Sequence, residues 1–429
     1  MHTLTVTLKQ HTPLIHFQHD QEGATLRASE VKPKLDKFIL TKLGKGDYQT
    51  GVREALEKKW LVGKGDHPAL DYKMRIEAEG NTDEYLLASY LKDDSIKNLK
   101  RCGINSVGDT PFFAQEKQNG QIVRSSNSRS EWDKIDKKGI IEKNIITVTI
   151  FFKNAILAEM VSNGVQSFFI STNFGTRQSK GFGCFSPVRI IFDEETINLE
   201  PIEKVLERNF CFVYKKSIEG QGIATILSTI NRDYRLLKSG LTRPYAKSKL
   251  MLYADSIDSS IGWDKKYIKV NTNDYFENEE GDSYILKCKK ENKQYSYSPR
   301  DSYSYYRALL GLAEQFEFLL ENPPFGDIRN KMIIKVRNNN IQRYQSPLLF
   351  KVFDRYIYLV GNEVSPEMLD QPFNFLVSFQ KDKGYIDVNI DENGLPLYTP
   401  KAFSLRSFLS FAMQNNSNNA SLGYITIKD

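Results

Sequence analysis

A glycine-rich, basic run constrains this chain more than any other feature. It reads Asn173-Phe-Gly-Thr-Arg-Gln-Ser-Lys-Gly-Phe-Gly-Cys-Phe185. Glycine lets a backbone approach a ligand closely and present its N–H groups to an anion. Arg177 and Lys180 add charge for phosphate, and Phe182 and Phe185 offer rings on which a base can stack. The run therefore predicts a site for a phosphate-bearing ligand.

The elements predicted around this run narrow the choice of ligand. A helix is expected over Ala155 to Ile170 and a strand over Val188 to Phe192, because of their apolar patterns. This order is the reverse of the strand–glycine loop–helix that binds nucleotides, so the Rossmann and P-loop interpretations fail. Contact with an RNA backbone fits better. The alternative is an ordinary glycine-rich connection between a helix and a strand.

Length and charge limit the number of domains and the kinds of partner that this chain can have. A chain of 429 residues is long enough for two domains, each with its own core. The formal net charge of +6 and the pI of about 8.8 are compatible with a nucleic-acid partner. No apolar stretch approaches the roughly 18 residues that span a bilayer. The first residues, Met1 to Leu8, alternate like a strand rather than a signal peptide, so we expect a cytoplasmic protein with no membrane partner.

Metal and cofactor sites are not predicted. The four cysteines, Cys102, Cys184, Cys211 and Cys288, lie far apart and lack metal-ligand spacing, so they are expected to be reduced thiols. The residues His11, His16, His19 and Asp20 match no well-defined metal site either.

The first half predicts an α+β unit with a long excursion. A strand over Thr3 to Lys9 and a basic helix over Glu30 to Leu43 precede an insertion at 44–144, which includes a less certain strand at 71–78. Within the insertion, Asn119-Gly120 separates two extendable segments and predicts a hairpin. A strand over Ile145 to Phe152 follows. With the later helix and strand, this order predicts a ferredoxin-like βαββαβ unit.

The second half predicts a second α+β domain. Helices are expected over Gly222 to Leu237 and Tyr303 to Leu320, and strands over Lys331 to Val336, Leu348 to Val360 and Phe375 to Phe379. The predicted domains are therefore residues 1–197 and 198–429.

Three motifs in this order resemble a known family. They are Thr12-Pro-Leu-Ile15, then Leu26-Arg-Ala-Ser-Glu-Val-Lys32 at the start of a helix, and then Gly175-Thr-Arg-Gln-Ser-Lys-Gly-Phe-Gly183. Together they resemble the RAMP superfamily of CRISPR effector subunits, and most of all the head-capping subunit of type III-B (Cmr) complexes. The matched motifs cover a few dozen residues, nearly all in the first half. Gln178 and the large insertion depart from the family pattern.

The resemblance implies two ferredoxin-like (RRM-like) RAMP domains in a non-catalytic subunit of an effector ribonucleoprotein. Such a subunit would bind crRNA and target RNA, assemble with other RAMP subunits and cap the backbone filament, without a cofactor. The hairpin would be a candidate for the projection that such subunits insert between nucleotides, or else a surface hairpin with no ligand. The implied RNA-binding residues are Arg27, Lys32, Asn173, Gly175, Arg177, Ser179, Lys180, Gly181, Phe182 and Gly183.

An alternative of a different class is a metal-independent endoribonuclease that processes crRNA. His16 or His19 would act as the general base, since histidine titrates near neutrality. Asp20 matches the acidic loop residue that cuts target RNA in RAMP backbone subunits. The mid-chain position of the glycine run disfavours the processing enzyme, and the head-capping subunits are not generally regarded as slicing ones.

Aromatic and basic residues also cluster in the second half: Tyr295, Tyr297, Arg300, Tyr303, Tyr305, Tyr306 and Arg307. They predict either a surface for stacked bases or a packed helix face.

Overall fold

The computed structural model describes residues 1–15, 26–63, 68–87, 106–107, 117–118, 121–122, 138–242, 244–268, 271, 302–319, 328–341, 343–381, 384–389, 396–414 and 421–429. The chain divides into two compact units. Unit 1 comprises Met1–Asp233, Leu349–Gly361 and Tyr424–Asp429, and unit 2 comprises Tyr234–Leu348 and Asn362–Gly423.

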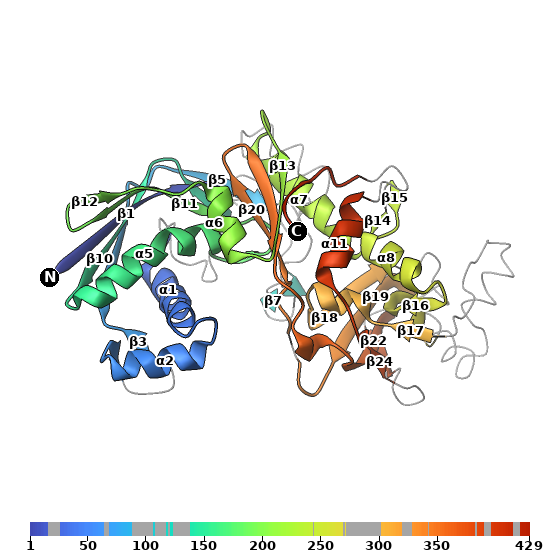
Figure 1. Cartoon of the computed structure of the whole chain (residues 1–429). Coiled ribbons are helices and arrows are strands. Elements are labelled where there is room, and N and C mark those ends of the chain that lie inside the picture. The colour runs from blue at the N-terminus through green and yellow to red at the C-terminus, as the bar shows by residue number, and fades with distance from the viewer. Residues whose placement is uncertain are drawn as a thin grey trace, which may run out of the picture. The chain divides into compact units, whose positions relative to one another are not determined.

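The first sheet of unit 1 has five strands in the order β12-β11-β1-β10-β4. Their bounds are β1 His2–Gln10, β4 Tyr72–Ala78, β10 Ile146–Phe152, β11 Phe185–Phe192 and β12 Glu195–Ile197. All pairings are antiparallel. Helices α1 (Ala28–Leu43) and α5 (Ala155–Ser171) pack against one face of this sheet (Figure 1).

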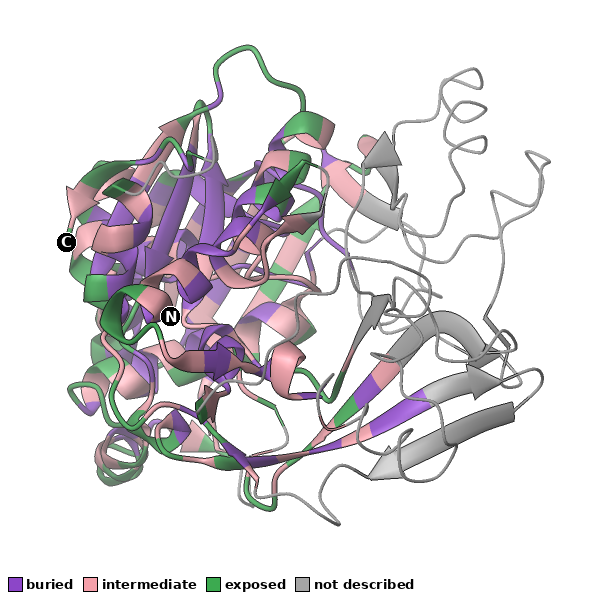
Figure 2. Cartoon of the chain, turned by 90° about the vertical axis from the view of Figure 1, so that its right-hand side faces the viewer, coloured by how far each residue is buried: buried purple, intermediate pink, exposed green. Residues whose placement is uncertain are grey.

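The alternation of buried and exposed residues along the strands explains why helices cover only one face of this sheet. Leu4, Val6 and Leu8 of β1 are fully buried, as are Ile146 and Val148 of β10. Side chains in a strand alternate between the two faces, so these residues all point to the side of α1 and α5. The residues between them are more exposed. Figure 2 colours each described residue by its burial and shows buried strands inside the protein. The core of the first sheet therefore lies between it and its two helices.

The predicted insertion contains one strand of the sheet itself. Strand β4 pairs with β10 over its whole length, as expected for residues 71–78. Before it come helix α2 (Tyr48–Glu57) and the short pair β2 (Leu61–Val62) and β3 (Ala69–Leu70). After it, β5 (Thr82–Leu87) pairs with β6 (Ser106–Val107) and β9 (Lys138–Glu142).

The hairpin predicted inside the insertion is present. Strands β7 (Lys117–Gln118) and β8 (Gln121–Ile122) pair antiparallel, with Gln118 opposite Gln121. Residues 119 and 120 lie outside the described residues.

The second sheet of unit 1 has the order β20-β21-β13-β25, again antiparallel where β13 meets its neighbours. Its strands are β13 Phe212–Ser217, β20 Leu348–Phe353, β21 Tyr356–Gly361 and β25 Ile425–Lys428. Along the chain, helices α7 (Ile223–Lys238) and α11 (Leu405–Gln414) alternate with these strands. Helix α6 (Ile202–Asn209) joins a core that includes Val213, Val360 and Phe353.

Unit 2 holds a separate antiparallel sheet in the order β18-β19-β22-β23, with β24 paired to β22. Its elements are β14 Leu241–Thr242, β15 Tyr245–Ala246, α8 Lys249–Ile257, β16 Ile261–Trp263, β17 Ser302–Ser304, the 3-10 helices η2 Tyr306–Leu310 and η3 Pro366–Met368, β18 Gln315–Leu319, β19 Ile328–Arg337, β22 Pro372–Lys381, β23 Gly384–Asn389 and β24 Leu397–Tyr398.

The helix predicted over Tyr303 to Leu320 is wrong. Only the five residues of η2 are helical there, and they end at Gly311, whose φ of 107° no helix accommodates. From Gln315 to Leu319 apolar and polar residues alternate, which is the period of a strand, and this segment forms β18. The predicted helix at Gly222 to Leu237 and the strands at Lys331 to Val336 and Phe375 to Phe379 are present as α7, β19 and β22. The single strand predicted over Leu348 to Val360 is instead two strands, β20 and β21, because the chain turns at Asp354, whose φ is 47°.

Candidate functional site

The glycine-rich run forms the connection between α5 and β11 and folds back on itself. Gly175, Gly181 and Gly183 have φ values of 74°, 78° and 65°, and Arg177 has a φ of 57°. A Cβ on Gly183 would lie 2.0 Å from the carbonyl oxygen of Phe174. Glycine is therefore required here by the protein's own backbone, because any larger residue would collide with it.

The three sequence motifs that carry the family resemblance meet at this loop. The backbone N–H of Gly183 donates to the carbonyl of Pro13, and that of Thr176 to the carbonyl of Ile15. The N–H of Gly175 donates to Glu30 Oε1 at 2.6 Å, which links the start of α1 to the loop. Segments far apart in the sequence thus fix both ends of the loop.

Asn173 is the polar centre of this arrangement. Its side chain is buried, and its Nδ2 donates to the carbonyl oxygens of Gln178 and Phe350, at 2.7 and 3.0 Å. Its Oδ1 accepts from Lys351 Nζ at 2.7 Å and its backbone oxygen from Lys34 Nζ at 3.2 Å. Since Phe350 and Lys351 belong to β20, one asparagine connects the loop to the edge strand of the second sheet.

Lys351 is a fully buried lysine inside the otherwise apolar strand β20. Its pKa is lowered to about 7, chiefly by burial, with the nearby Cys184 opposing the shift and Lys34 contributing to it. Cys184 is also fully buried, and burial raises the pKa of its thiol. Its Sγ donates to Asn173 Oδ1 at 3.4 Å. The loop and β20 therefore share a buried polar cluster consisting of Asn173, Cys184 and Lys351.

His11, at the end of β1, makes a second connection to the same strand. Its Nε2 lies 2.8 Å from Ser186 Oγ, and its Nδ1 accepts from the backbone N–H of Asp354 at 3.3 Å. Burial lowers the pKa of His11 to about 4, despite the opposing charge of Asp354. The imidazole is therefore neutral near pH 7, with Nε2–H donating to Ser186.

Three of the predicted RNA-binding residues lie on the outer part of the loop. Arg177, Ser179 and Lys180 are each partly exposed. The backbone oxygen of Ser179 accepts from the N–H of Phe350 at 3.1 Å, and Lys180 forms a parallel bridge with Phe350. These residues sit on a backbone that β20 holds in place, so their side chains have a rigid base.

The other predicted loop residues lie inside the protein. Phe182 keeps 2% of its surface exposed and Phe185 none, so neither ring has an open face for a base. Gly181 faces Ile230, whose Cδ1 would be 2.6 Å from an added Cβ. Asn173, Gly175 and Gly183 are used in the internal contacts described above. These residues shape the loop, and stacking on Phe182 or Phe185 is not supported, because packing in the core covers both rings.

The two predicted residues of the first helix differ in their surroundings. Lys32 Nζ donates to Asp36 Oδ2 at 2.8 Å and to the carbonyl of Leu70 at 2.9 Å, and it lies 4.1 Å from the ring centre of Tyr72. It therefore ties α1 to β3 and β4. Arg27 immediately precedes α1 and is partly exposed.

The candidate catalytic residues His16, His19 and Asp20 lie outside the described residues. Among the residues that the structure describes, no three histidine, cysteine, aspartate or glutamate side chains come together in a way that suits a metal ion. No helix in the described part of the chain is long and apolar enough to cross a membrane.

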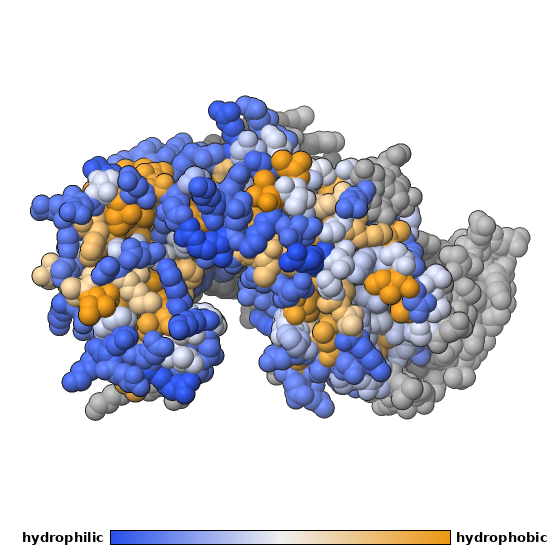
Figure 3. Space-filling model, viewed as in Figure 1, coloured by the Kyte–Doolittle hydropathy of each residue, from blue (hydrophilic) through white to orange (hydrophobic). Residues whose placement is uncertain are grey.

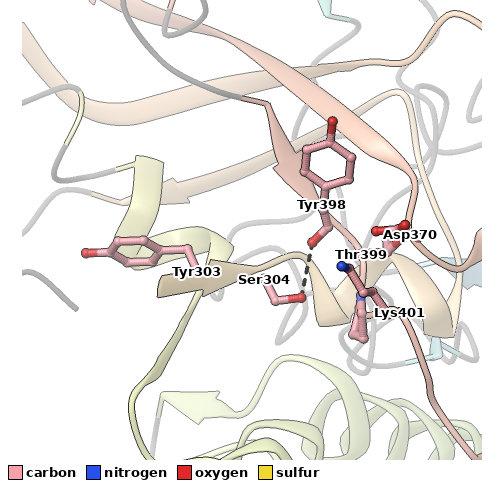
Figure 4. A pocket seen from close by; sticks show the side chains of 7 residues that line it. Tyr303, Ser304, Asp370, Tyr398, Thr399 and Lys401 are labelled. Carbon is pink, nitrogen blue, oxygen red and sulfur yellow. Dashed lines mark hydrogen bonds between the residues drawn. The ribbon is translucent and has the colours of Figure 1, made fainter. Parts of the chain in front are cut away.

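The aromatic and basic cluster of the second half is mostly interior. Tyr305 and Tyr306 are buried, and Arg307 Nε lies 2.8 Å from Asp264 Oδ2 in a buried ion pair. Packing is therefore the correct interpretation for these three, although Tyr306 and Arg307 belong to a 3-10 helix rather than an α-helix and Tyr305 precedes it. Tyr303 instead lines an open pocket of about 520 Å³ together with Tyr398 and others (Figure 4). Tyr295, Tyr297 and Arg300 lie outside the described residues.

Sequence reasoning missed Lys351, Glu30 and His11 as parts of this site. For Lys351 there was a signal, because a single lysine in the run Leu348-Leu-Phe-Lys-Val-Phe353 must be buried with a partner. No local pattern indicated that Glu30 would reach Gly175.

Comparison with known proteins identifies the family. The family model of the Cmr1 N-terminal domain matches residues 1–241, and that of the Cmr1 C-terminal domain matches residues 245–428. No curated protein sequence matches the chain.

Solved structures resemble the chain more distantly. The crystal structure of apo Cmr1 from Pyrococcus furiosus is 10% identical, with a TM-score of 0.36 over 96% of both chains. A chain of the type III-B Cmr-beta complex bound to cognate target RNA and AMPPnP, in the presence of ssDNA, is 12% identical, with a TM-score of 0.30 over 83% of this chain and 94% of that chain. A chain of the target-RNA-bound complex is 11% identical, with a TM-score of 0.25 over 45% of this chain and 60% of that chain.

These matches place the chain among the RAMP proteins of type III CRISPR effectors. Within that class it belongs to the Cmr1 family, which confirms the resemblance to the head-capping subunit of Cmr complexes.

Gly183→Ala is expected to destabilise the protein strongly. The new Cβ would meet the Phe174 carbonyl, and alanine is disfavoured at the φ of 65°. We expect a loss of more than about 2 kcal/mol in the free energy of unfolding, measured by urea denaturation. Gly222→Ala is the control, because nothing lies within 4 Å of its added Cβ. Equal losses in both variants would contradict the packing described.

Lys351 is expected to give the stability a distinctive pH dependence. Its pKa is about 7 in the folded protein and about 10.4 in an unfolded chain. Between these values the unfolded state binds the extra proton, so this residue makes stability rise with pH, by up to about 1.4 kcal/mol per pH unit. Below pH 7 the lysine is protonated in both states and its contribution is constant. The measurement is urea denaturation from pH 6.5 to 10.

Lys351→Met should flatten that rise, because methionine has no titrating group. The comparison uses the slope with pH rather than absolute stability, since the substitution also removes the hydrogen bond to Asn173. Lys37→Met, at an exposed position of α1, is the matched control and should keep the wild-type slope. The same slope in wild type and Lys351→Met would contradict a buried lysine of lowered pKa.

Proposed function

We propose that this chain is a non-catalytic RNA-binding and assembly subunit of a type III CRISPR effector ribonucleoprotein. It binds the backbone of crRNA through the outer part of the glycine-rich loop and caps the filament of backbone subunits. Its partners are crRNA, target RNA and the other RAMP subunits of the complex.

One observation carries the proposal. Arg177, Ser179 and Lys180 are partly exposed on a loop whose ends are fixed by Glu30, by the Pro13–Ile15 segment and by β20. Cations held on a rigid backbone bind phosphate at a smaller entropic cost than cations on a flexible loop. A loop that merely joined a helix to a strand would not need contacts with three distant segments.

The two RAMP domains are proposed to be ferredoxin-like and to span residues 1–197 and 198–429. The order β11-β1-β10-β4 of the first sheet supports the first. These strands and their two helices occur along the chain in the βαββαβ order β1, α1, β4, β10, α5 and β11, with other elements inserted between them. The order β20-β21-β13-β25 of the second sheet supports the second domain. Its strands and helices also occur in the βαββαβ order along the chain, as β13, α7, β20, β21, α11 and β25. The sheet and helices between these elements are then insertions in the second domain.

The test is the salt dependence of RNA binding. Arg177→Gln/Lys180→Gln should weaken binding of a guide-length crRNA, because each lost phosphate contact no longer releases counterions. The slope of log affinity against log salt should become smaller by about 0.7 per contact, as for other single strands. Lys37→Gln/Arg53→Gln is the control, since it removes the same charge from exposed positions on α1 and α2.

Two results would contradict the proposal. Wild-type protein that binds no crRNA, alone or with co-expressed RAMP subunits, would remove the RNA-binding role. An unchanged slope in the loop variant would remove the loop from the interface. Cleavage of repeat RNA by the purified protein, lost in His16→Ala/His19→Ala, would instead support the endoribonuclease alternative.

A further inference from the structure

The first sheet has a second face that its helices do not cover. The residues that alternate with the buried ones lie there, and the pairing of the strands places them in rows. The central row runs across the strands from Arg75 through Thr149 and Thr5 to Ile191. The row on one side of it consists of Glu77, Thr147, Thr7 and Arg189. The row on the other side consists of Lys73, Phe151 and Thr3. All of them are partly or fully exposed. We call these residues the open face.

The open face is polar and carries an excess of positive charge. It holds the cations Lys73, Arg75 and Arg189, against the single carboxylate of Glu77 among the residues just named. Arg75 pairs with Glu77 at 2.6 Å, with both side chains more than half exposed, so the pair leaves the cation accessible. Lys73 and Arg189 lie on different strands, β4 and β11, and flank the face.

The remaining side chains add hydroxyl groups and one aromatic ring. Threonine hydroxyls both donate and accept hydrogen bonds and are among the groups that contact nucleic-acid phosphates and sugars. Phe151 lies between Lys73 and Thr3 on β10, with its ring on the exposed side of the sheet. An aromatic ring on the open surface of an antiparallel sheet is a platform for an unpaired base.

We propose that the open face binds single-stranded RNA, with Lys73, Arg75 and Arg189 on phosphates and Phe151 stacked on a base. This rests on the proposed function and adds to it a second RNA contact, on the same unit as the glycine-rich loop. The charge complementarity favours RNA over a protein partner, because protein interfaces bury an apolar centre and here only Phe151 and Ile191 are apolar. Stacking on Phe151 requires an unpaired base, so a single strand fits better than a duplex.

The experiment measures binding of an unstructured RNA oligonucleotide and of crRNA at several salt concentrations. Lys73→Gln/Arg189→Gln removes two cations from the open face without breaking the Arg75–Glu77 pair. We expect about tenfold weaker binding and a salt slope smaller by about 0.7 per contact. The control is Lys37→Gln/Arg53→Gln, whose exchanged residues lie on the helical side, where the surface over α2 is largely hydrophilic (Figure 3).

A second variant separates stacking from charge. Phe151→Leu keeps an apolar side chain but removes the aromatic ring, and it should weaken binding about fivefold with an unchanged salt slope. Phe151→Trp should retain binding. RNA should quench the tryptophan fluorescence of this variant more than that of wild type, which has only the native tryptophans.

The outcomes distinguish this proposal from the proposed function. RNA binding by wild type that is weakened in the loop variant but unchanged in both open-face variants would overturn the open face alone. No RNA binding by wild type would overturn both. In a third outcome, Lys73→Gln/Arg189→Gln binds RNA as wild type does but no longer co-purifies with RAMP subunits. That result would assign the open face to a protein partner and also overturn the proposal.

Discussion

The hydrogen bond between Lys351 Nζ and Asn173 Oδ1 is the contact on which the rest of unit 1 depends. It connects the loop that closes the first sheet to the edge strand of the second. A buried lysine is costly unless its donors are satisfied, and a buried asparagine is costly unless all its groups are paired. Lys351 donates to the Asn173 side chain here, and Asn173 Nδ2 donates in turn to the carbonyl oxygens of Gln178 and Phe350. The arrangement of the loop on β20 is therefore specific, because a shifted register would leave both groups unpaired.

The contact between Lys351 and Asn173 changes the interpretation of the glycine-rich run. Its sequence predicted a backbone that approaches a ligand, yet Gly175 and Gly183 approach the protein's own carbonyl groups, at Ile15 and Phe174. What remains for a ligand is the outer part, at Arg177, Ser179 and Lys180. The same composition serves both purposes, because a tightly folded loop holds its partly exposed cations more rigidly than an open one. Shape and charge are thus provided by different residues of one motif.

Helices and strands that follow from a local pattern of residues could be predicted from the sequence. Contacts between residues far apart in the chain could not. The alternation in β1 and β10 and the helical period of α5 and α7 were sufficient for these elements. The helix expected at Tyr303 failed, because Gly311 and the alternation of β18 outweighed the apolar content. The contacts of Glu30 with Gly175 and of Lys351 with Asn173 join residues more than a hundred positions apart, and only the folded chain reveals them.

The lysines of α1 show why charge in the sequence is a weak guide to a binding surface. Lys32 and Lys34 both belong to the helix predicted as basic, but Lys32 donates to the Leu70 carbonyl of β3 and Lys34 to the Asn173 carbonyl of the glycine-rich loop. Their ammonium groups already have partners, so moving them to a phosphate would cost the internal hydrogen bonds that they make. Lys73 and Arg189 on the first sheet were not singled out from the sequence, yet they are exposed on a surface of positive charge. Binding energy for RNA is better supplied by cations of this second kind, because the fold does not already use them.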